Sequence, residues 1–339
     1  METRTLGQSG VAVSIVGLGT WPMGGEWWGG TDDGESVRTI HRALELGVTL
    51  FDTAEAYASG HAEEVLGRAL AGRRERAVIA DKVATNHFAP EQIEAAFEAS
   101  CRRLQTDYID VYFLHWPNID LPIGPVMETL ERLRDAGRIR AIGVSNFTST
   151  ELEAIGQYGR VDVLQPPYNM FWRFIEGDQL PYCQDHGLGI MAYSGLAQGL
   201  LTGTFTPQTA FAAGDKRPTT VLFQPGHYER CLAAVEALRP IAQRAGLTVP
   251  QMAINWLLNR PGLSAGLLGA RTVREIEENA DGAPWQLSAE DGAAADAATR
   301  AVFEALPRVP DMFQNWQNWE LQRRRYEQSG QLPTVTPGE

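Results

Sequence analysis

The sequence predicts an α/β fold: a single (β/α)8 TIM barrel with an N-terminal β-hairpin plug and a C-terminal helical tail. Two observations support this prediction. Short apolar or β-branched runs alternate with longer stretches of helical periodicity, and eight such runs suffice to close a barrel. The length of 339 residues also fits, because barrels of this kind often exceed about 250 residues as one domain. We therefore expect the barrel over residues 1–310 and a helical extension over residues 311–339.

The first predicted element is a hairpin, in which Thr3–Leu6 and Val11–Val13 flank the turn-forming segment Gly7-Gln8-Ser9-Gly10. Eight strand candidates follow it in order: Ile15–Leu18, Val48–Phe51, Ala77–Ala80, Ile109–Leu114, Arg140–Val144, Val161–Leu164, Gly189–Ala192 and Ala265–Leu268. The stretches between them that show helical periodicity include Glu35–Leu46, Pro90–Leu104, Gly124–Ala136 and Arg230–Ala245.

Two later segments depart from this alternation. The stretch from Gly203 to Tyr228 is a long loop rich in Gly, Pro and Thr, and loops of this length usually carry function. We expect it to cover a bound ligand. The tail from Asp311 onward predicts one amphipathic helix with a frayed end, and its Arg323–Arg325 run is typical of a solvated helix face.

Composition excludes several classes of function. A net charge of −13 repels phosphate backbones, which argues against nucleic acid and anionic membranes as partners and favours a small-molecule substrate. The three cysteines are too few and too scattered for a disulfide framework or a zinc site, and the histidines lack metal-ligand spacing. The polar N-terminus and the lack of an apolar run of about 18 residues predict a cytoplasmic protein.

Polar side chains follow three consecutive predicted strands at the end where a barrel carries its active site. Asp52 and Tyr57 follow the second strand, Lys82 follows the third, and His115 follows the fourth. Each residue alone has an ordinary interpretation as an ion-paired, rim or hydrogen-bonded side chain. Their occurrence together and in this order predicts a catalytic site.

These segments resemble the catalytic motifs of the aldo-keto reductases: Phe51-Asp52-Thr53-Ala54 with Tyr57, then Lys82, then Leu114-His115-Trp116-Pro117. The resemblance extends from Leu6 to about Asn279. The Trp-rich segment at residues 19–32 is most similar to the bacterial branch that includes general-stress aldo-keto reductases. The resemblance implies an NAD(P)H-dependent oxidoreductase that reversibly reduces an aldehyde, a ketone or a sugar carbonyl.

The implied roles agree with elementary chemistry. Tyr57 is the expected proton donor to the carbonyl oxygen, and an ammonium at Lys82 lowers the pKa of a neighbouring phenol. Asp52 is expected to keep Lys82 charged and oriented. His115 is expected to be a neutral donor that orients the carbonyl.

The resemblance also implies a coenzyme site, with Tyr193 stacked on the nicotinamide and Ser145, Asn146 and Gln165 on its carboxamide. Ser145 and Asn146 have a second interpretation as N-caps of the following helix. The residues expected to bind the coenzyme are Thr20, Trp21, Asp52, Ser145, Asn146, Gln165, Tyr193, Ser194, Leu196, Gln198, Gly199, Gly269, Ala270, Arg271, Thr272, Glu275, Glu278 and Asn279.

Four residues depart from the family pattern: Ala58, Asp81, Gly195 and Glu275. Glu275 stands where Arg or Gln commonly helps to bind the adenosine phosphate, and a carboxylate there weakens the case for NADP. Arg271 offers a planar fork suited to a 2′-phosphate at a helix N-terminus. We therefore expect NADP(H) to be favoured by a narrow margin, with NAD(H) possible.

Tryptophans gather near the predicted mouth of the barrel. Trp21, Trp27 and Trp28 lie in the Gly-rich loop after the first strand, and Trp116 adjoins His115. A tryptophan is more often packing than ligand. We nevertheless expect these four, with Tyr57 and His115, to bind the substrate as an aromatic wall.

Two other classes of function compete with the reductase. One is an NADPH-binding, redox-sensing regulatory protein on the same scaffold, like the potassium-channel β-subunits. The other is a barrel hydrolase, which needs two acids across a cleft; the acid found here, Asp52, is paired with Lys82, which suits pKa tuning better.

Overall fold

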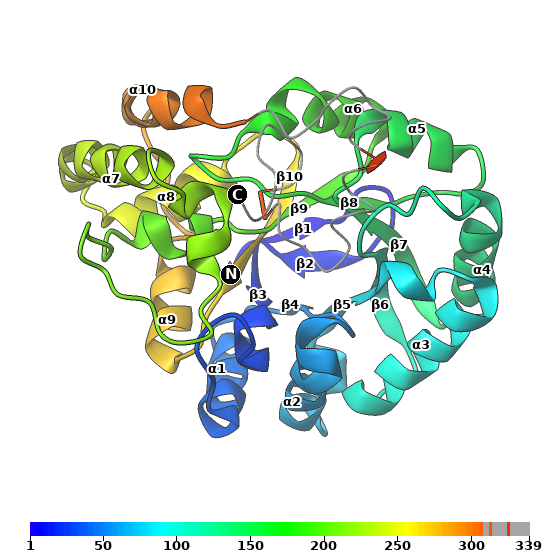
Figure 1. Cartoon of the computed structure of the whole chain (residues 1–339). Coiled ribbons are helices and arrows are strands. Elements are labelled where there is room, and N and C mark those ends of the chain that lie inside the picture. The colour runs from blue at the N-terminus through cyan, green and yellow to red at the C-terminus, as the bar shows by residue number, and fades with distance from the viewer. Residues whose placement is uncertain (308–311, 314–323, 326–339) are drawn as a thin grey trace.

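The computed structural model describes residues 1–307, 312–313 and 324–325. Within this part of the chain, eight parallel strands form a closed barrel in the order β10-β3-β4-β5-β6-β7-β8-β9, with helices around it (Figure 1). The barrel strands are β3 (Val16–Gly19), β4 (Leu50–Asp52), β5 (Val78–Val83), β6 (Ile109–Leu114), β7 (Ile139–Ser145), β8 (Val163–Gln165), β9 (Gly189–Ala192) and β10 (Leu263–Gly269). The predicted (β/α)8 barrel is confirmed.

The helices cover the outside of the barrel because each buries one apolar stripe against the strands. In α1, for example, Ile40, Ala43 and Leu44 are buried while the Asp32 side chain caps the first turn. The helices are α1 (Asp33–Glu45), α2 (His61–Leu70), α3 (Pro90–Leu104), α4 (Ile123–Asp135), α5 (Ser149–Gly156), α6 (Gln179–His186), α7 (His227–Arg244), α8 (Val249–Leu258), α9 (Val273–Asp281) and α10 (Ala289–Ala305).

The N-terminal hairpin closes one end of the barrel, as expected. Strands β1 (Thr3–Thr5) and β2 (Ala12–Ser14) pair antiparallel, and Leu6, Val11 and Val13 join the apolar cluster inside the barrel. Gly7 has φ +51°, and a Cβ there would lie 2.4 Å from the Asp162 carbonyl oxygen. The hairpin turn therefore needs a glycine to approach the barrel wall this closely.

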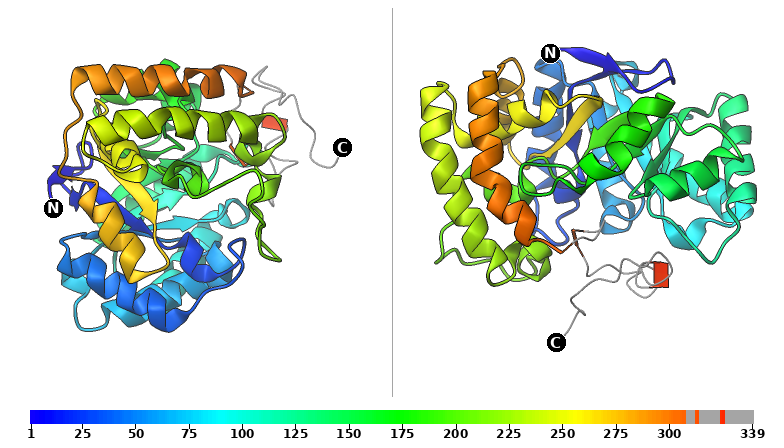
Figure 2. Two further views of the ribbon diagram at one scale, coloured as in Figure 1. Left: turned by 90° about the vertical axis from the view of Figure 1, so that its left-hand side faces the viewer. Right: turned by 90° about the horizontal axis from the view of Figure 1, so that it is seen from above.

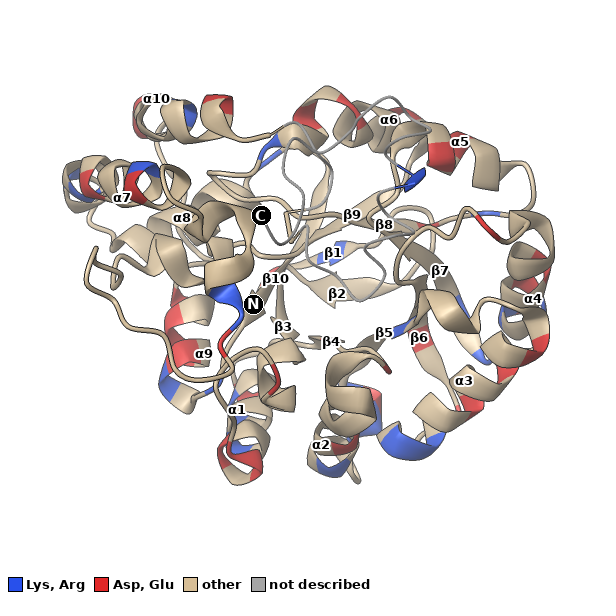
Figure 3. Ribbon diagram, viewed as in Figure 1, with Lys and Arg blue, Asp and Glu red and all other residues tan. Residues whose placement is uncertain are grey.

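Charge is concentrated on the outer helices, while the barrel strands carry few charged residues (Figure 3). Helices α7 and α10 lie side by side over one flank of the barrel (Figure 2). Between α7 and the preceding strand, the long loop predicted over residues 203–228 contains only short 3₁₀ turns, at Arg217–Thr219 and Val221–Phe223, before α7 begins. Most of the helix predicted from Asp311 onward lies outside the described residues.

Candidate active site

Three of the four predicted catalytic side chains form one hydrogen-bonded cluster at the carboxyl ends of β4 and β5. The Lys82 ammonium donates to Asp52 Oδ1 at 2.8 Å, to the Thr53 carbonyl oxygen at 2.7 Å and to Tyr57 Oη at 3.1 Å. Lys82 is fully buried and Asp52 is only 4% exposed. All three partners of the ammonium are oxygen atoms, so its charge is compensated although it has left water.

Tyr57 lies on a tight turn after β4, followed by Ala58 at φ +49° and Ser59 at φ +53°. The glycine that the family usually has after the tyrosine would adopt this left-handed conformation freely, whereas alanine is strained in it. The rings of Tyr57 and His115 meet edge to face with centroids 5.8 Å apart, and Trp21 stacks beside Tyr57 at 6.0 Å. His115 thus completes the predicted set of four.

Burial controls the proton affinities in this cluster. Burial lowers the pKa of His115 well below its usual value, and the Lys82 charge adds to the effect, so both favour a neutral imidazole. Burial raises the pKa of Tyr57 to about 12, against the opposing effect of Lys82. Burial by itself would lower the pKa of Lys82. The interactions of the ammonium with Asp52 and Tyr57 together outweigh this effect, so the pKa of Lys82 is raised. Lys82 therefore acts on the pKa of Tyr57 in the expected direction, but desolvation of the buried phenol outweighs it.

A second cluster adjoins the first through Gln165, whose amide donates to Asp52 Oδ2 at 2.8 Å. The Asn146 amide donates to the His115 carbonyl oxygen at 3.1 Å and to Ser145 Oγ at 3.0 Å, and it accepts from the Tyr193 hydroxyl at 2.8 Å. The residues expected to hold the nicotinamide therefore contact the catalytic residues directly.

The alternative interpretation of Ser145 and Asn146 as helix caps is wrong. Helix α5 is capped by Thr148, which forms a reciprocal capping box with Glu151. Ser145 Oγ instead donates to the Gln165 carbonyl oxygen at 2.8 Å, on the neighbouring strand β8.

Both clusters border a cavity of about 1130 Å³ that runs from the barrel mouth to the N-terminus of α9. Most of the predicted site residues line it: Trp21, Trp28, Asp52, Tyr57, His115, Trp116, Ser145, Asn146, Gln165, Tyr193, Ser194, Leu196, Gln198, Gly199, Gly269, Arg271, Thr272, Glu275, Glu278 and Asn279. The other four are not part of this lining. Thr20 donates to the Asp52 carbonyl oxygen, Trp27 packs against Trp21, Ala270 is buried, and Lys82 is covered by its partners.

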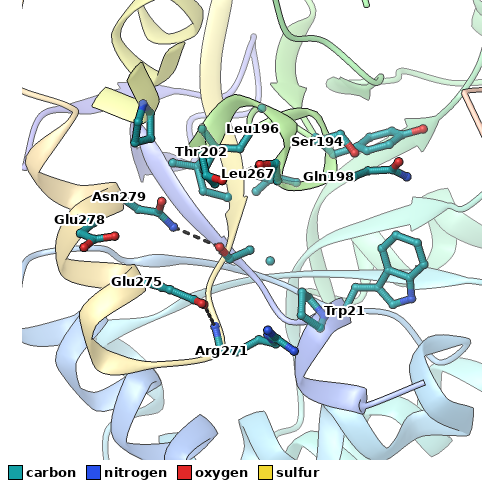
Figure 4. A pocket seen from close by; sticks show the side chains of 18 of the residues that line it. Trp21, Ser194, Leu196, Gln198, Thr202, Leu267, Arg271, Glu275, Glu278 and Asn279 are labelled. Atoms are coloured by element: carbon teal, nitrogen blue, oxygen red, sulfur yellow. Dashed lines mark hydrogen bonds between the residues drawn. The ribbon is translucent and has the colours of Figure 1, made fainter. Parts of the chain in front are cut away.

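The far end of the cavity is formed by the first turn of α9 (Figure 4). Thr272 caps this helix, and the Glu275 carboxylate accepts from the Arg271 backbone N–H at 2.6 Å. Arg271 Nη1 donates to the Trp28 carbonyl oxygen at 3.2 Å, and the Asn279 amide donates to the Gly269 carbonyl oxygen at 3.1 Å. Glu275 thus occupies a backbone donor of the kind that a phosphate binds at a helix N-terminus.

Sequence reasoning missed several lining residues. Arg217 comes from the long loop after β9, pairs with Asp215 at 2.6 Å, and lies 5.2 Å above the Trp28 ring. Phe205 of the same loop also lines the cavity. Phe313 lines it too, with its ring parallel to that of Tyr193 at 6.1 Å. The adjacent cations Lys216 and Arg217 in a long Gly/Pro-rich loop were the one available signal for Arg217.

The fold and the arrangement of the site are typical of oxidoreductases built on a barrel. The model of the Aldo/keto reductase family matches residues 15–300. The chain belongs to the aldo-keto reductase family. It is 39% identical to the aldo-keto reductase YhdN of Bacillus subtilis over 86% of this chain and 91% of that one. It is 33% identical to the NADH-specific methylglyoxal reductase of Escherichia coli over 91% of this chain and 100% of that one.

Solved structures agree with these relatives. A glycerol dehydrogenase from Gluconobacter oxydans superposes with a TM-score of 0.81 at 35% identity, covering 91% of this chain and 96% of that one. An aldo/keto reductase from Klebsiella pneumoniae in complex with NADP and acetate gives 0.74 at 32% identity, covering 92% and 98%. The family is therefore supported by both sequence and fold.

The described residues contain neither a membrane-spanning helix nor a metal-binding cluster. No helix there is long and apolar enough to span a membrane. No group of three or more His, Cys, Asp or Glu side chains within the same residues is arranged to hold a metal ion. All three cysteines are buried and unpaired.

Proposed function

We propose that this aldo-keto reductase transfers hydride between NAD(P)H and the carbonyl group of an aldehyde, a ketone or a sugar. The observation that carries the proposal is the contact of the buried Lys82 ammonium with both the Asp52 carboxylate, at 2.8 Å, and the Tyr57 hydroxyl, at 3.1 Å. A phenol held against an ammonium at the edge of a large cavity suits proton donation to a developing alkoxide.

The cavity is suited to a nicotinamide dinucleotide. Its volume of about 1130 Å³ lies just above the usual range for small-molecule sites, about 300–1,000 Å³, and leaves room for a coenzyme and a small substrate. Asn146, Gln165 and Ser145 offer amide and hydroxyl groups at one end, where Tyr193 offers a flat ring. Arg217 and Arg271 offer cations for phosphates farther along. When bound there, the reduced nicotinamide supplies the hydride.

The protein's own residues would manage the proton and the charge. With a pKa of about 12, Tyr57 is protonated at neutral pH and thus in the form that donates. As the proton leaves Tyr57 Oη, the Lys82 charge 3.1 Å away stabilises the phenolate. His115 stays neutral, so it orients the carbonyl oxygen as a hydrogen-bond donor without competing as an acid.

The preference between coenzymes is proposed to be NADPH over NADH by a narrow margin. In the described part of the chain, Arg217 and Arg274 are ion-paired with carboxylates, whereas Arg271 makes no such pair, so its charge is available to a 2′-phosphate. Glu275 opposes this preference, because its carboxylate accepts from the Arg271 backbone N–H at 2.6 Å. It would have to release that N–H before a phosphate could bind there. The NADH specificity of the methylglyoxal reductase relative agrees with a family in which this balance varies.

Initial rates decide the proposal. Small aldehydes, bulkier ketones and sugars are tested against the purified protein with NADPH and NADH in parallel, each monitored by loss of absorbance of the reduced coenzyme. We expect carbonyl-dependent oxidation with both coenzymes and faster turnover with NADPH. Tight coenzyme binding without turnover on any carbonyl would overturn the reductase and favour the redox-sensing alternative.

A further inference from the structure

Arg325 lies against the segment that joins β7 to α5, where it contacts Asn146 and Glu151. The short red segment in Figure 2 is residues 324–325. The sequence predicted a solvated helix face for Arg323–Arg325. For Arg325 this prediction is wrong, because its exposed fraction is only 4%. A buried guanidinium needs partners for its charge and donors, and these partners belong to the turn between β7 and α5.

The contacts of Arg325 bridge that turn. Its Nε donates to Glu151 Oε1 at 2.5 Å, and its Nη2 donates to Glu151 Oε2 and to the Asn146 carbonyl oxygen, the latter at 2.8 Å. Glu151 Oε2 also accepts from the Thr148 backbone N–H at 2.8 Å as part of the α5 capping box. The Arg325 guanidinium thus connects Asn146, which follows β7, to Glu151 in the first turn of α5.

The residue held at the β7 side is in an unusual conformation. Asn146 has φ +67°, a left-handed value that surrounding contacts must maintain. Its side chain in turn contacts the His115 carbonyl oxygen, Ser145 and the Tyr193 hydroxyl. A shift of the Asn146 backbone would therefore move the amide that faces the nicotinamide end of the cavity.

We propose that Arg325 is a positioning residue for the nicotinamide carboxamide, acting through the backbone carbonyl of Asn146. The inference rests on the proposed function, since it assumes that Asn146 faces the coenzyme's nicotinamide. It adds a contribution from residue 325, which lies beyond the 15–300 span of the family model. The planar fork of arginine matters here, because one lysine ammonium cannot reach both the carboxylate and the carbonyl with the same geometry.

The neighbouring residue supplies a matched control. Arg324 pairs with Asp120 at 2.6 and 2.9 Å, but these two side chains are 41% and 51% exposed. Exposed pairs contribute little, and Asp120 lies in the loop after β6, away from Asn146 in sequence. Removing one positive charge at residue 324 therefore controls for net charge and for general weakening of this segment.

The test compares whole coenzymes with fragments that lack nicotinamide. Arg325→Gln, Arg325→Lys and Arg324→Gln are made in the full chain, and their thermal unfolding midpoints are recorded. Each is titrated with NADPH, NADH, ADP-ribose and 2′-phospho-ADP-ribose by intrinsic fluorescence. We expect Arg325→Gln to raise the Kd of the whole coenzymes about tenfold, the value of one lost good hydrogen bond, with the fragments unchanged within about twofold. Arg325→Lys should give an intermediate loss.

The outcomes separate the two proposals. If wild-type protein binds neither coenzyme, the proposed function fails. If it binds them normally and Arg325→Gln affects whole coenzyme and fragment equally, or neither, the positioning role is overturned. It is also overturned if Arg324→Gln matches Arg325→Gln. Should Arg325→Gln fail to fold, Arg325→Lys provides the same comparison, and equal losses for coenzyme and fragment would reject the role.

Discussion

The two ends of the cavity are built in different ways. At the catalytic end, Asp52, Tyr57, Lys82 and His115 are each at most 9% exposed, and a chain of short hydrogen bonds through Lys82 joins the first three. At the α9 end, Arg271 is exposed, and the Arg274–Glu278 pair has side chains that are 85% and 54% exposed. The side chains at the catalytic end are buried and most are hydrogen-bonded to one another, whereas those at the α9 end are largely exposed.

The difference predicts where substitutions are costly. In a water-excluded site electrostatic interactions are strong, and leaving a buried group unpaired is expensive. Exposed charges are screened and contribute about 0–1 kcal/mol per pair. The chemistry at the catalytic end should therefore respond steeply to small changes, whereas coenzyme selectivity at the α9 end should be adjustable by single residues in modest steps.

The largest effect is expected for Tyr57→Phe. The variant removes the proton donor but keeps the ring that packs between Trp21 and His115. Loss of a positioned acid typically lowers the rate by about 10²–10⁴, so kcat should fall by that factor while the Kd of NADPH changes little. Steady-state rates and fluorescence titration check both. Wild-type turnover in the variant would reject the assigned mechanism.

Asp81, which precedes Lys82 in β5, is a buried carboxyl group in the barrel wall. It pairs in register with Tyr112 of β6, it is fully buried, and no described side chain hydrogen-bonds its carboxylate. Burial, and then the neighbouring Glu63, raise the pKa of Asp81 well above its usual value. The folded state therefore binds this proton more tightly than the unfolded state. The resulting stability is complete below about pH 3.8 and is lost as the pH rises through the folded-state pKa.

Asp81→Asn removes that loss, because the amide is neutral at every pH. The variant should gain free energy of unfolding relative to the wild type as the pH rises from 5 to 8, by up to about 1.4 kcal/mol per pH unit until the folded-state pKa is passed. Urea denaturation at several pH values measures the difference. A difference independent of pH would contradict the assignment of a buried, protonated Asp81.

The sequence predicts the residues at the catalytic end better than those that reach the site from distant segments. Strand periodicity and the position of polar residues after strand ends located Asp52, Tyr57, Lys82 and His115, because a barrel brings successive strand ends to one mouth. The pKa of Tyr57 could not be predicted in the same way, since burial depends on how the whole mouth packs. Arg217 reaches the site from a long loop without periodicity. Phe313 and Arg325 come from the tail, where the helical pattern predicts an element but not which barrel residues it contacts.

The α9 end gives the next effect in size. Arg271→Ala should weaken NADPH binding about tenfold or more and barely change NADH, because a charged hydrogen bond to the 2′-phosphate is worth about 1.5–3 kcal/mol. Glu275→Gln should tighten NADPH, since it removes the negative charge that now accepts from the Arg271 N–H. Fluorescence titration of both coenzymes against both variants decides the point. If the wild type binds NADH more tightly and Arg271→Ala is indifferent to the phosphate, Glu275 reads the ribose instead.

The smallest effect is expected at Trp28, which contacts both ends. Its ring lies edge-on to Trp21 at 5.4 Å on the substrate side, and its carbonyl oxygen accepts from Arg271 at 3.2 Å. Trp28→Ala removes the ring and keeps the carbonyl. Because aromatic contacts are worth about 0.5–1.5 kcal/mol, KM should rise about two- to tenfold for aromatic aldehydes and little for small ones. Trp28→Phe, which keeps a flat ring, should recover most of the loss. Equal changes in KM for substrates of every size, or a large fall in the unfolding midpoint of both variants, would return Trp28 to a packing role.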